Sequence, residues 1–330
     1  MDFKYTRQQL IELQSRPLRW KVQRTIGLIT EWYREHEGKV YISFSGGKDS
    51  TVLLYLARKF FPDIPAVFVD TGLEYPEVRE FALSHDNVVR LRPKMSFPEV
   101  LKKYGYPVIG KEVAQHVRDY RRGNAYAVNA INGLNRDGSY SEFRQRFKKY
   151  KFLTEAPFAI SNRCCDVMKE QPLDSHKRAT KRVPIIGTMT YESQRRQAGW
   201  LQEGCNAFKS GKSKPMSLWT EQDVLRYLKG KKIPYASVYG NIEPVNSQLT
   251  LEGYDGTLEL TGAKRTGCMF CMFGIMLDKS PNRFRRMKQT HPRLYDYCIG
   301  GGSYDENGML LPDKNGLGIG KVLDFIGVQY

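Results

Sequence analysis

Hydrophobic and polar residues follow two different periods along the first third of this chain. Between residues 6 and 35 apolar side chains recur at helical spacing, and Pro17 divides the run, which predicts two helices. Short runs rich in β-branched and aromatic residues predict strands at 40–44, 66–70 and 87–93, with segments of helical periodicity between them. Strands that alternate with helices are joined by right-handed crossovers, so the pattern predicts an α/β fold with a doubly wound parallel sheet.

The pattern changes in the second third of the chain. Apolar periodicity fades between residues 110 and 152, where Arg, Lys, Tyr, Asn and Gly dominate, and this predicts an inserted arm or helical pair that faces solvent. Periodicity returns with a predicted strand at 182–188 and a helix that begins after Thr220, a residue type suited to cap it. Residues 240–330 are rich in glycine, and we predict an irregular structure for them.

Composition adds a strong positive charge to this picture. The chain has 52 Lys and Arg against 35 Asp and Glu, a net charge of +17. Residues 111–151 hold ten of the basic and four of the acidic residues, and residues 279–293 hold six basic and no acidic residues. In and around both stretches cations are interleaved with Tyr or Phe, a composition that binds phosphates and stacks on bases. This predicts contact with a nucleic acid, and a merely solvated face is the alternative.

Two classes of location are disfavoured by the sequence. No stretch approaches the roughly 20 apolar residues that a membrane span requires, so we expect no membrane insertion. The N-terminal residues lack the basic-then-apolar order of a secretory signal, which predicts a cytoplasmic protein whose thiols are reduced. The oligomeric state is left open.

A glycine turn stands between the first predicted strand and the helix after it. The sequence SGGKDS, residues 45–50, puts two glycines and two serines where backbone N–H groups and a helix N-terminus stabilise an anion. A Walker A loop is excluded, because Lys48 precedes Asp49 rather than Ser or Thr, and no glycine lies five positions before Gly47. The turn therefore predicts a phosphate-binding loop of another kind.

SGGKDS resembles the PP-loop of the ATP pyrophosphatases, the adenine nucleotide alpha hydrolase superfamily. The resemblance implies that ATP is split between its α and β phosphates, so that an acceptor becomes adenylylated and activated. VDTGLEYPEV (69–78) and IIGTMTYESQRR (185–196) resemble two motifs of the phosphoadenosine phosphosulfate (PAPS) reductase family in that superfamily. They place Asp70 at a strand end where ligands of open sheets bind, and bring Arg195 or Arg196 to the phosphates or sulfate. A capping aspartate and a surface arginine are the alternatives.

The resemblance implies a nucleotide site for ATP, or for adenylylsulfate (APS) or PAPS as substrate. The predicted catalytic residues are Lys48, Asp49, Asp70 and Arg195; the lysine would neutralise charge on the departing pyrophosphate, and either aspartate would position Mg²⁺. The predicted nucleotide-binding residues are Ser43, Phe44, Ser45, Gly46, Gly47, Lys48, Asp49, Ser50, Val69, Asp70, Thr71, Gly72, Gly187, Thr188, Glu192, Ser193, Arg195 and Arg196.

Four of the six cysteines form two close pairs. Cys164 and Cys165 are adjacent, and Cys268 and Cys271 form a C-x-x-C, so four thiolates could converge on one metal centre. Zinc accepts four sulfurs, and unmetallated redox thiols are a further alternative. The adjacent pair followed about a hundred residues later by C-x-x-C resembles the [4Fe-4S] site of assimilatory APS reductases, which implies a cluster held by all four residues.

The motifs also divide the chain. We expect a helical lead-in at 1–37, a PP-loop nucleotide-binding α/β domain at 38–240 with its basic insertion at 110–152, and a C-terminal region, 241–330, that completes the cluster site. The two single cysteines, Cys205 and Cys298, are expected as small buried residues, with a nucleophile or persulfide carrier as the alternative.

The function depends on which branch of the family the chain follows. A sulfonucleotide reductase attacks the sulfate sulfur of APS or PAPS with a cysteine on a C-terminal tail, and the tail KVLDFIGVQY holds neither Cys nor His. The intact PP-loop and the basic segments favour ATP-dependent sulfur transfer to a nucleic acid, tRNA or DNA, with a donor such as a cysteine desulfurase. An APS or PAPS reductase that releases sulfite is the first alternative. Adenylylation without sulfur chemistry and a nucleotide- and redox-sensing nucleic-acid-binding protein are the others.

Overall fold

The computed structural model of the chain describes residues 3–245 and 256–330. Residues 1–2 and 246–255, the latter within the predicted C-terminal region, lie outside the described residues. The chain divides into two units. Unit 1 comprises Met1–Asp70, Glu74–Leu91 and Leu173–Thr266, and unit 2 comprises Thr71–Leu73, Arg92–Pro172 and Gly267–Tyr330.

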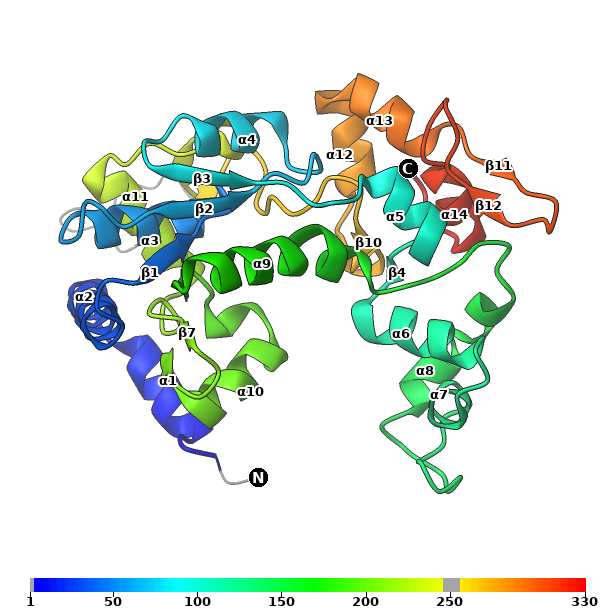
Figure 1. Cartoon of the computed structure of the whole chain (residues 1–330), viewed down its shortest axis with the longest axis horizontal. Coiled ribbons are helices and arrows are strands. Elements are labelled where there is room, and N and C mark those ends of the chain that lie inside the picture. Colours follow the sequence, from blue (N-terminus) through cyan, green and yellow to red (C-terminus); the bar gives the residue numbers. More distant parts are fainter. Residues whose placement is uncertain (1–2, 246–255) are drawn as a thin grey trace. The chain divides into compact units, whose positions relative to one another are not determined.

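Four strands of the central sheet of unit 1 form from the predicted apolar runs, and two short strands that were not predicted extend it (Figure 1). Its first five strands in sheet order pair in parallel, and the last two, which are short, pair antiparallel with each other. This confirms the predicted parallel sheet. In sheet order the strands are β3 (Val88–Leu91), β2 (Ala66–Val69), β1 (Val40–Ser43), β5 (Val183–Ile186), β7 (Lys212–Ser213) and β6 (Asn206–Ala207).

Helices cover both faces of this sheet. Side chains alternate along a strand, so Val40 and Ile42 of β1 enter the main core while Tyr41 faces the opposite side. The centre of the Tyr41 ring lies 5.4 Å from the centre of the His176 ring in α9. Figure 1 shows α4 and α9 on opposite sides of the strands. The helices are α1 (Arg7–Ser15), α2 (Leu18–Glu35), α3 (Lys48–Arg58), α4 (Pro76–Leu83), α9 (Gln171–Thr180, begun in unit 2), α10 (Gln194–Glu203) and α11 (Glu221–Lys231).

The helix ends follow the sequence signals. The two predicted N-terminal helices form on either side of Pro17, and Thr6 caps the first with its hydroxyl. Thr220 caps α11, as predicted, and Asp223 completes a reciprocal capping box with it. The Asp223 carboxylate also accepts a 2.6 Å hydrogen bond from the buried ammonium group of Lys21, which ties α2 to α11. Unit 1 also contains η3 (Thr190–Glu192), η4 (Ser237–Tyr239), β8 (Ile242–Pro244) and β9 (Leu258–Leu260).

Unit 2 contains the basic insertion, for which either an arm or a pair of helices was predicted. The insertion is helical. β4 and β10 are a parallel pair of two-residue strands; α6 contacts β4, and α7 packs against α6 and α8. The elements up to the second cysteine segment are α5 (Phe97–Tyr104), β4 (Val108–Ile109), α6 (Lys111–Tyr120), α7 (Ala125–Ile131), α8 (Gln145–Lys148), η1 (Lys151–Glu155), η2 (Asp166–Glu170) and β10 (Met272–Phe273).

The C-terminal part of unit 2 is more regular than predicted. Three helices form there, so the expected irregular structure is an incomplete description. Periodicity is faint in α12 because most of its side chains are charged or polar, and only Phe284 and Met287 are buried. The elements are η5 (Ile275–Leu277), α12 (Arg283–Thr290), α13 (Pro292–Ile299), β11 (Ser303–Tyr304), β12 (Leu310–Leu311) and α14 (Ile319–Phe325). Across the described residues, none of the helices combines the length and apolar character that a membrane span needs.

Candidate functional site

The turn between β1 and α3 has a conformation that selects glycine. Gly46 has a φ of +71°, and a side chain there would come within 2.7 Å of the carbonyl oxygen of Val78 in α4. β1 ends at Ser43, Phe44 is buried, and Gly47 begins α3 as its cap. The predicted turn therefore joins a strand end directly to a helix N-terminus.

Two serine hydroxyls close this turn. The Oγ of Ser50 accepts the N–H of Ser45 at 3.2 Å, lies 3.1 Å from Ser45 Oγ and donates to the carbonyl oxygen of Gly47 at 2.9 Å. The N–H of Gly47 donates to Ser45 Oγ at 3.3 Å. Hydroxyl groups and the first N–H groups of α3 thus gather at the positive end of the helix dipole, where an anion is stabilised.

Lys48, the first residue of α3, is buried, and three oxygens hold its ammonium group. Nζ lies 3.5 Å from Oδ1 of Asp49 and 3.5 Å from Oε1 of Glu221, and donates to the carbonyl oxygen of Lys264 at 3.4 Å. Burial raises the pKa of Asp49, although the charge of Lys48 opposes the rise. The turn therefore has a fixed cation and, beside it, two carboxylates of the kind that Mg²⁺ prefers.

Two hydroxyls that the sequence analysis missed also reach the turn. The hydroxyl oxygen of Tyr239 accepts the N–H of Lys48 at 3.2 Å and lies 2.5 Å from Oγ1 of Thr266. Glu221 was missed as well, although it directly follows the predicted cap Thr220, and this position could have indicated it. Tyr239 and Thr266 lie in a part of the sequence without a periodic pattern, so only the fold reveals their position.

Tyr191 and Arg265 extend this charged cluster. Burial, reinforced by the charges of Glu221 and Asp49, raises the pKa of Tyr191 to about 12, while a hydrogen bond with Arg265 opposes the rise. Burial lowers the pKa of Arg196, and the Asp49 charge opposes that shift. Two guanidinium groups therefore share one electrostatic environment with the Asp49 carboxylate.

Asp70 follows β2, as predicted, and two arginines that were not predicted bind its carboxylate. The Nε of Arg79 donates to both carboxylate oxygens, at 3.0 and 3.1 Å, and the Nε of Arg90 donates to Oδ2 at 2.7 Å. Burial raises the pKa of Asp70, but these hydrogen bonds outweigh burial and the net shift is downward. The carboxylate is ionised and holds two guanidinium groups at the end of β2.

The segment after β5 packs against the turn. A side chain at Gly187 would lie 3.4 Å from the carbonyl oxygen of Asp49, so the two backbones approach closely. Both Arg195 and Arg196 are exposed, but only Arg196 forms an ion pair with Glu192 and interacts with the charge of Asp49. Of the two predicted arginines, Arg196 is the one that the fold brings to the Asp49 carboxylate.

The other predicted nucleotide-binding residues divide between the units. Ser193 caps α10 with its hydroxyl, Thr188 is half-buried, and Val69 ends β2, all in unit 1. Thr71 and Gly72 belong to unit 2, where Thr71 is buried and Gly72 has a φ of +74°. A nucleotide contact at these positions stays a prediction.

The four paired cysteines line one narrow, mainly apolar cavity of unit 2. Leu73, Phe97, Pro107, Met168 and Lys169 form the rest of its wall. A hydrogen bond between the neighbouring thiols lowers the pKa of Cys165 and raises that of Cys164, and the charges of Lys111 and Lys169 lower the former further. Burial raises the pKa of Cys271 to about 11.

Four sulfurs on one mainly apolar cavity with lysines beside it form a donor set that suits an iron–sulfur cluster. Three or more Cys, His, Asp or Glu side chains arranged around one metal ion do not occur among the described residues. The cluster and the four cysteines as its ligands therefore stay predictions.

Both single cysteines are buried. Cys298 on α13 has no exposed surface, and burial raises its pKa. Cys205 is nine-tenths buried in a small apolar cluster, where its sulfur accepts the indole N–H of Trp200 at 3.3 Å and burial again raises the pKa. These features match the expected small buried residues and do not favour a thiolate nucleophile at either position.

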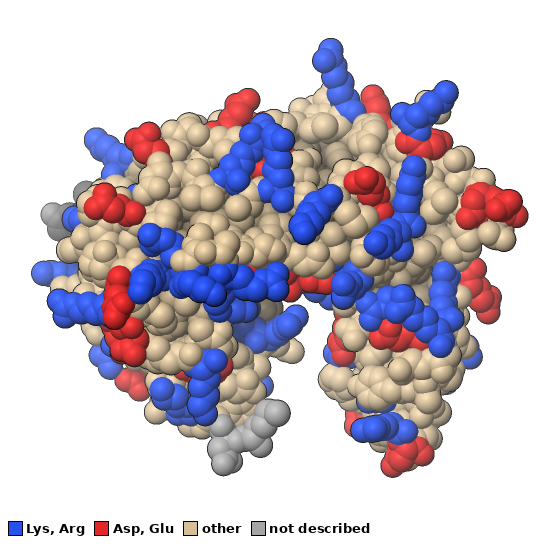
Figure 2. Space-filling view, viewed as in Figure 1, with Lys and Arg blue, Asp and Glu red and all other residues tan. Residues whose placement is uncertain are grey.

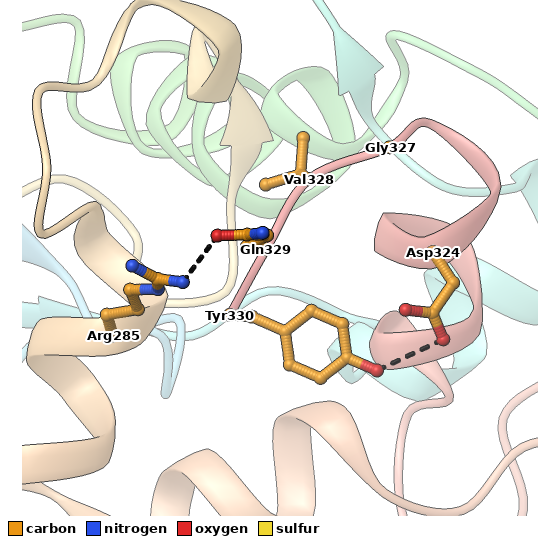
Figure 3. A pocket seen from close by; sticks show the side chains of 6 residues that line it. All are labelled: Arg285, Asp324, Gly327, Val328, Gln329 and Tyr330. Atoms are coloured by element: carbon orange, nitrogen blue, oxygen red, sulfur yellow. Dashed lines mark hydrogen bonds between the residues drawn. The ribbon is translucent and has the colours of Figure 1, made fainter.

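The final residues of the chain line a cavity of about 520 Å³ together with Arg285 and Asp324 (Figure 3). Gln329 is held from two sides: Asn282 donates to its backbone oxygen at 2.6 Å, and Arg285 donates to its side-chain oxygen at 2.7 Å. The hydroxyl of Tyr330 donates to Asp324 at 3.1 Å. None of the described residues that line this cavity carries sulfur.

Comparison with known families gives a match to most of the chain. Residues 39–136 and 112–272 match the sequence profile of the phosphoadenosine phosphosulfate reductase domain. An uncharacterized protein of Methanocaldococcus jannaschii is 25% identical over 293 residues, which is 84% of this chain and 51% of that protein. This chain thus spans about half the length of that relative.

Two relatives with named activities are also similar. Sulfate adenylyltransferase subunit 2 of Agrobacterium fabrum is 27% identical over 205 residues, 59% of this chain and 56% of that protein. Adenosine 5'-phosphosulfate reductase of Lysinibacillus sphaericus is 22% identical over 208 residues, 63% of this chain and 71% of that protein. Among solved structures, phosphoadenylyl-sulfate reductase from Candida auris in a phosphate complex has a TM-score of 0.36 and 15% identity, over 72% of this chain and 92% of that one.

Proposed function

Because the chain belongs to the phosphoadenosine phosphosulfate reductase domain family, we propose that it is a PP-loop enzyme that splits ATP between the α and β phosphates and transfers sulfur to a nucleic acid. One observation carries the proposal: the turn at residues 45–50 places two hydroxyls at a helix N-terminus whose first residue, Lys48, has a buried ammonium group. The name of one relative, sulfate adenylyltransferase, denotes adenylyl transfer, and ATP donates an adenylyl group by this same cleavage.

Each part of the turn has a role in this reaction. The N–H groups of Gly46 and Gly47 and the hydroxyls of Ser45 and Ser50 would bind the β and γ phosphates, with a phosphate oxygen replacing Ser45 Oγ as the acceptor of the Gly47 N–H. Lys48 would stabilise the negative charge that develops on the departing pyrophosphate, and its fixed position means that little reorganisation is needed.

The same cluster offers donors for Mg²⁺ and for a further phosphate contact. Asp49 and Glu221 would hold the ion together with phosphate oxygens, since Mg²⁺ usually takes one or two carboxylates at such sites. We prefer them to Asp70, because both oxygens of that carboxylate already accept hydrogen bonds from arginines. Arg196 is the arginine that we assign to the phosphates, because it shares the environment of Asp49.

The bond changes balance as two displacements. In the first, an acceptor oxygen of the nucleic acid attacks the α phosphorus, the bond to the bridging oxygen breaks, and pyrophosphate leaves with the bonding electrons. In the second, hydrosulfide attacks the activated carbon and AMP leaves with the former acceptor oxygen. The hydrosulfide comes from a persulfide donor, such as a cysteine desulfurase, by the action of a thiol reductant.

The cysteine cavity would hold a [4Fe-4S] cluster through Cys164, Cys165, Cys268 and Cys271. When bound, such a cluster supplies iron that binds sulfide or carries an electron. The protein's own contribution is an apolar wall that limits water and two lysine charges that offset those of the thiolates.

A sulfonucleotide reductase is the second candidate. It is favoured by the name of one relative, adenosine 5'-phosphosulfate reductase, and by the four cysteines. That reaction needs a thiolate that attacks sulfur, and the burial of Cys205 and Cys298 suits neither residue to this task. Sulfur transfer is therefore our first proposal.

One incubation experiment decides between these candidates. Anaerobically prepared protein is incubated with labelled ATP and, in separate reactions, with tRNA, DNA, APS or PAPS. We expect AMP and pyrophosphate only with a nucleic acid, together with sulfur incorporation when a persulfide donor and a thiol are added. Sulfite released from APS or PAPS with a thiol reductant would instead establish the reductase. Nucleotide binding without turnover in any of the four reactions would favour a nucleotide- and redox-sensing nucleic-acid-binding protein.

A further inference from the structure

The basic insertion of unit 2 exposes large aromatic rings. The side chains of Tyr140, Phe143 and Tyr126 are 70%, 65% and 46% exposed. Rings of this size normally supply core packing, and several exposed together mark a surface that binds a partner. We call residues 126–151 the aromatic arm.

The most exposed part of the aromatic arm is held in one conformation. Leu134 and Tyr140 form an antiparallel bridge, and the N–H of Asn135 donates to the carbonyl oxygen of Ser139 at 2.7 Å. At the tip, the carboxylate of Asp137 accepts both the N–H and the hydroxyl of Ser139, at 3.0 and 2.7 Å. Less conformational entropy is therefore lost when the exposed rings bind a partner.

Arginines stack against the rings of the arm. The guanidinium carbon of Arg146 lies 3.9 Å from the centre of the Phe143 ring and 4.7 Å from that of Phe147. The guanidinium of Arg144 lies 4.5 Å from the centre of the Tyr126 ring. The exposed rings Phe143 and Tyr126 thus each have a planar cation against them and offer flat surfaces, whereas Phe147 is buried.

Further cations surround these flat surfaces. Arg136 at the tip and Lys148 and Lys149 on α8 and its end are exposed to solvent. Figure 2 shows Lys and Arg side chains over α6 and over the segment below α7, with fewer Asp and Glu side chains among them. The arm therefore combines stacking surfaces with positive charge, which suits a partner with flat rings and negative charge.

We propose that the aromatic arm binds an unpaired nucleic-acid strand, with bases stacked on Tyr140 and Phe143 and phosphates beside Arg136 and Lys148. In a duplex the stacked neighbouring base pairs hide the base faces from such rings, so a duplex can use only the cations. The inference rests on the proposed function and narrows its acceptor to a single-stranded segment or a loop.

Fluorescence anisotropy with the full-length protein tests this binding. Labelled 20-nucleotide strands of one sequence are compared as single-stranded RNA, single-stranded DNA and the corresponding duplexes, without ATP. We expect the single strands to bind at least about fivefold more tightly than duplexes of equal length, since each stacked base adds about 1 kcal/mol or more. The tighter of the two single strands identifies the acceptor chemistry, whereas equal affinity for strands and duplexes overturns the proposal.

Variants separate stacking from charge. Tyr140→Ala and Phe143→Ala should each weaken single-strand binding at least about fivefold and leave the salt dependence unchanged. Arg136→Ala and Lys148→Ala should each lower the slope of log affinity against log salt by about 0.7, because each removes one phosphate contact. Tyr304→Ala is the matched control: this ring is 54% exposed beside the ammonium of Lys321, but Asp305 and Glu306 follow it.

The arm fails as a strand-binding surface if Tyr140→Ala and Phe143→Ala bind like the unaltered protein or like Tyr304→Ala. Circular dichroism of each variant shows that a loss of binding does not come from unfolding. These measurements are independent of ATP cleavage. If AMP is released with a nucleic acid but single strands bind no more tightly than duplexes, only the proposed role of the arm is rejected. If single strands bind more tightly but no AMP is released, only the proposed reaction is rejected.

Discussion

The phosphate loop of unit 1 and the cysteine cavity of unit 2 are built in different ways. Consecutive residues form the loop, and hydrogen bonds between Ser45, Gly47 and Ser50 fix it from within. The cavity takes its four thiols from two segments about a hundred residues apart. The loop is therefore preorganised by its own chain, whereas the cysteines depend on the packing of unit 2 and on whatever ion or cluster they bind. Changes at one site should leave the other intact.

The largest expected effect is on the loop. Lys48→Ala should lower pyrophosphate release by at least about a hundredfold, because it removes the fixed cation at the departing group. Pyrophosphate release and iron content are measured on the same preparation, with Lys59→Ala as a control on the far end of the same helix. Undiminished turnover would refute the loop assignment, and a loss of iron would refute the independence of the two sites.

The next effect is on the cavity. Cys268→Ser should remove the visible absorption of an iron–sulfur cluster and leave ATP binding by the loop within about twofold, because an alcohol is a poor replacement for a soft thiolate ligand. Cys205→Ser, at a buried cysteine outside the cavity, is the control. If the anaerobic wild-type protein is colourless and contains zinc, the iron–sulfur assignment is wrong, but the assignment of the four cysteines to one metal site stands.

The contrast between the two sites also explains what the sequence could predict. The loop, Asp70 and the parallel strands were found because local patterns specify them: SGGKDS needs a strand end and a helix start, and both formed. Tyr239 and Thr266 could not be found, because they reach Lys48 from about two hundred residues away and no periodicity marks them.

Charge pairing was equally hidden in the sequence. Asp70 lies in the expected place, but no local pattern indicated that Arg79 and Arg90 bind its two carboxylate oxygens. The helices at the C-terminal end were missed because α12 is so polar that its two buried side chains, Phe284 and Met287, make no visible pattern. Local signals placed the elements, while contacts between distant segments decided which side chains share a site.

A smaller effect tests the conformation of the loop. Gly46→Ala should lower the free energy of unfolding by about 1 to 3 kcal/mol from the positive φ alone, and more because the new methyl group would press on the carbonyl oxygen of Val78. Gly123→Ala is the matched control, since Gly123 has a φ of +75° but nothing within 4 Å of the added carbon. Denaturant unfolding and ATP affinity are measured for both. Equal behaviour of the two variants would mean that the close approach to α4 is unimportant.

The smallest effect tests a residue that only the fold revealed. Tyr239→Phe removes the hydroxyl that accepts the N–H of Lys48, which should raise the KM for ATP by about two- to tenfold, as expected for one hydrogen bond. Tyr227→Phe, at another buried tyrosine of unit 1, should leave it unchanged. If both variants keep the wild-type KM, Tyr239 has no part in positioning the loop.

The identity of the nucleotide product tests the central claim most directly. ATP labelled at both the α and γ phosphates is incubated with the anaerobic protein and a nucleic-acid acceptor, and the products are separated by chromatography. We predict label in AMP or an adenylylated acceptor and in intact pyrophosphate, all of which disappear in Lys48→Ala. Label in ADP and inorganic phosphate would contradict the account, because it would place the cleavage between the β and γ phosphates.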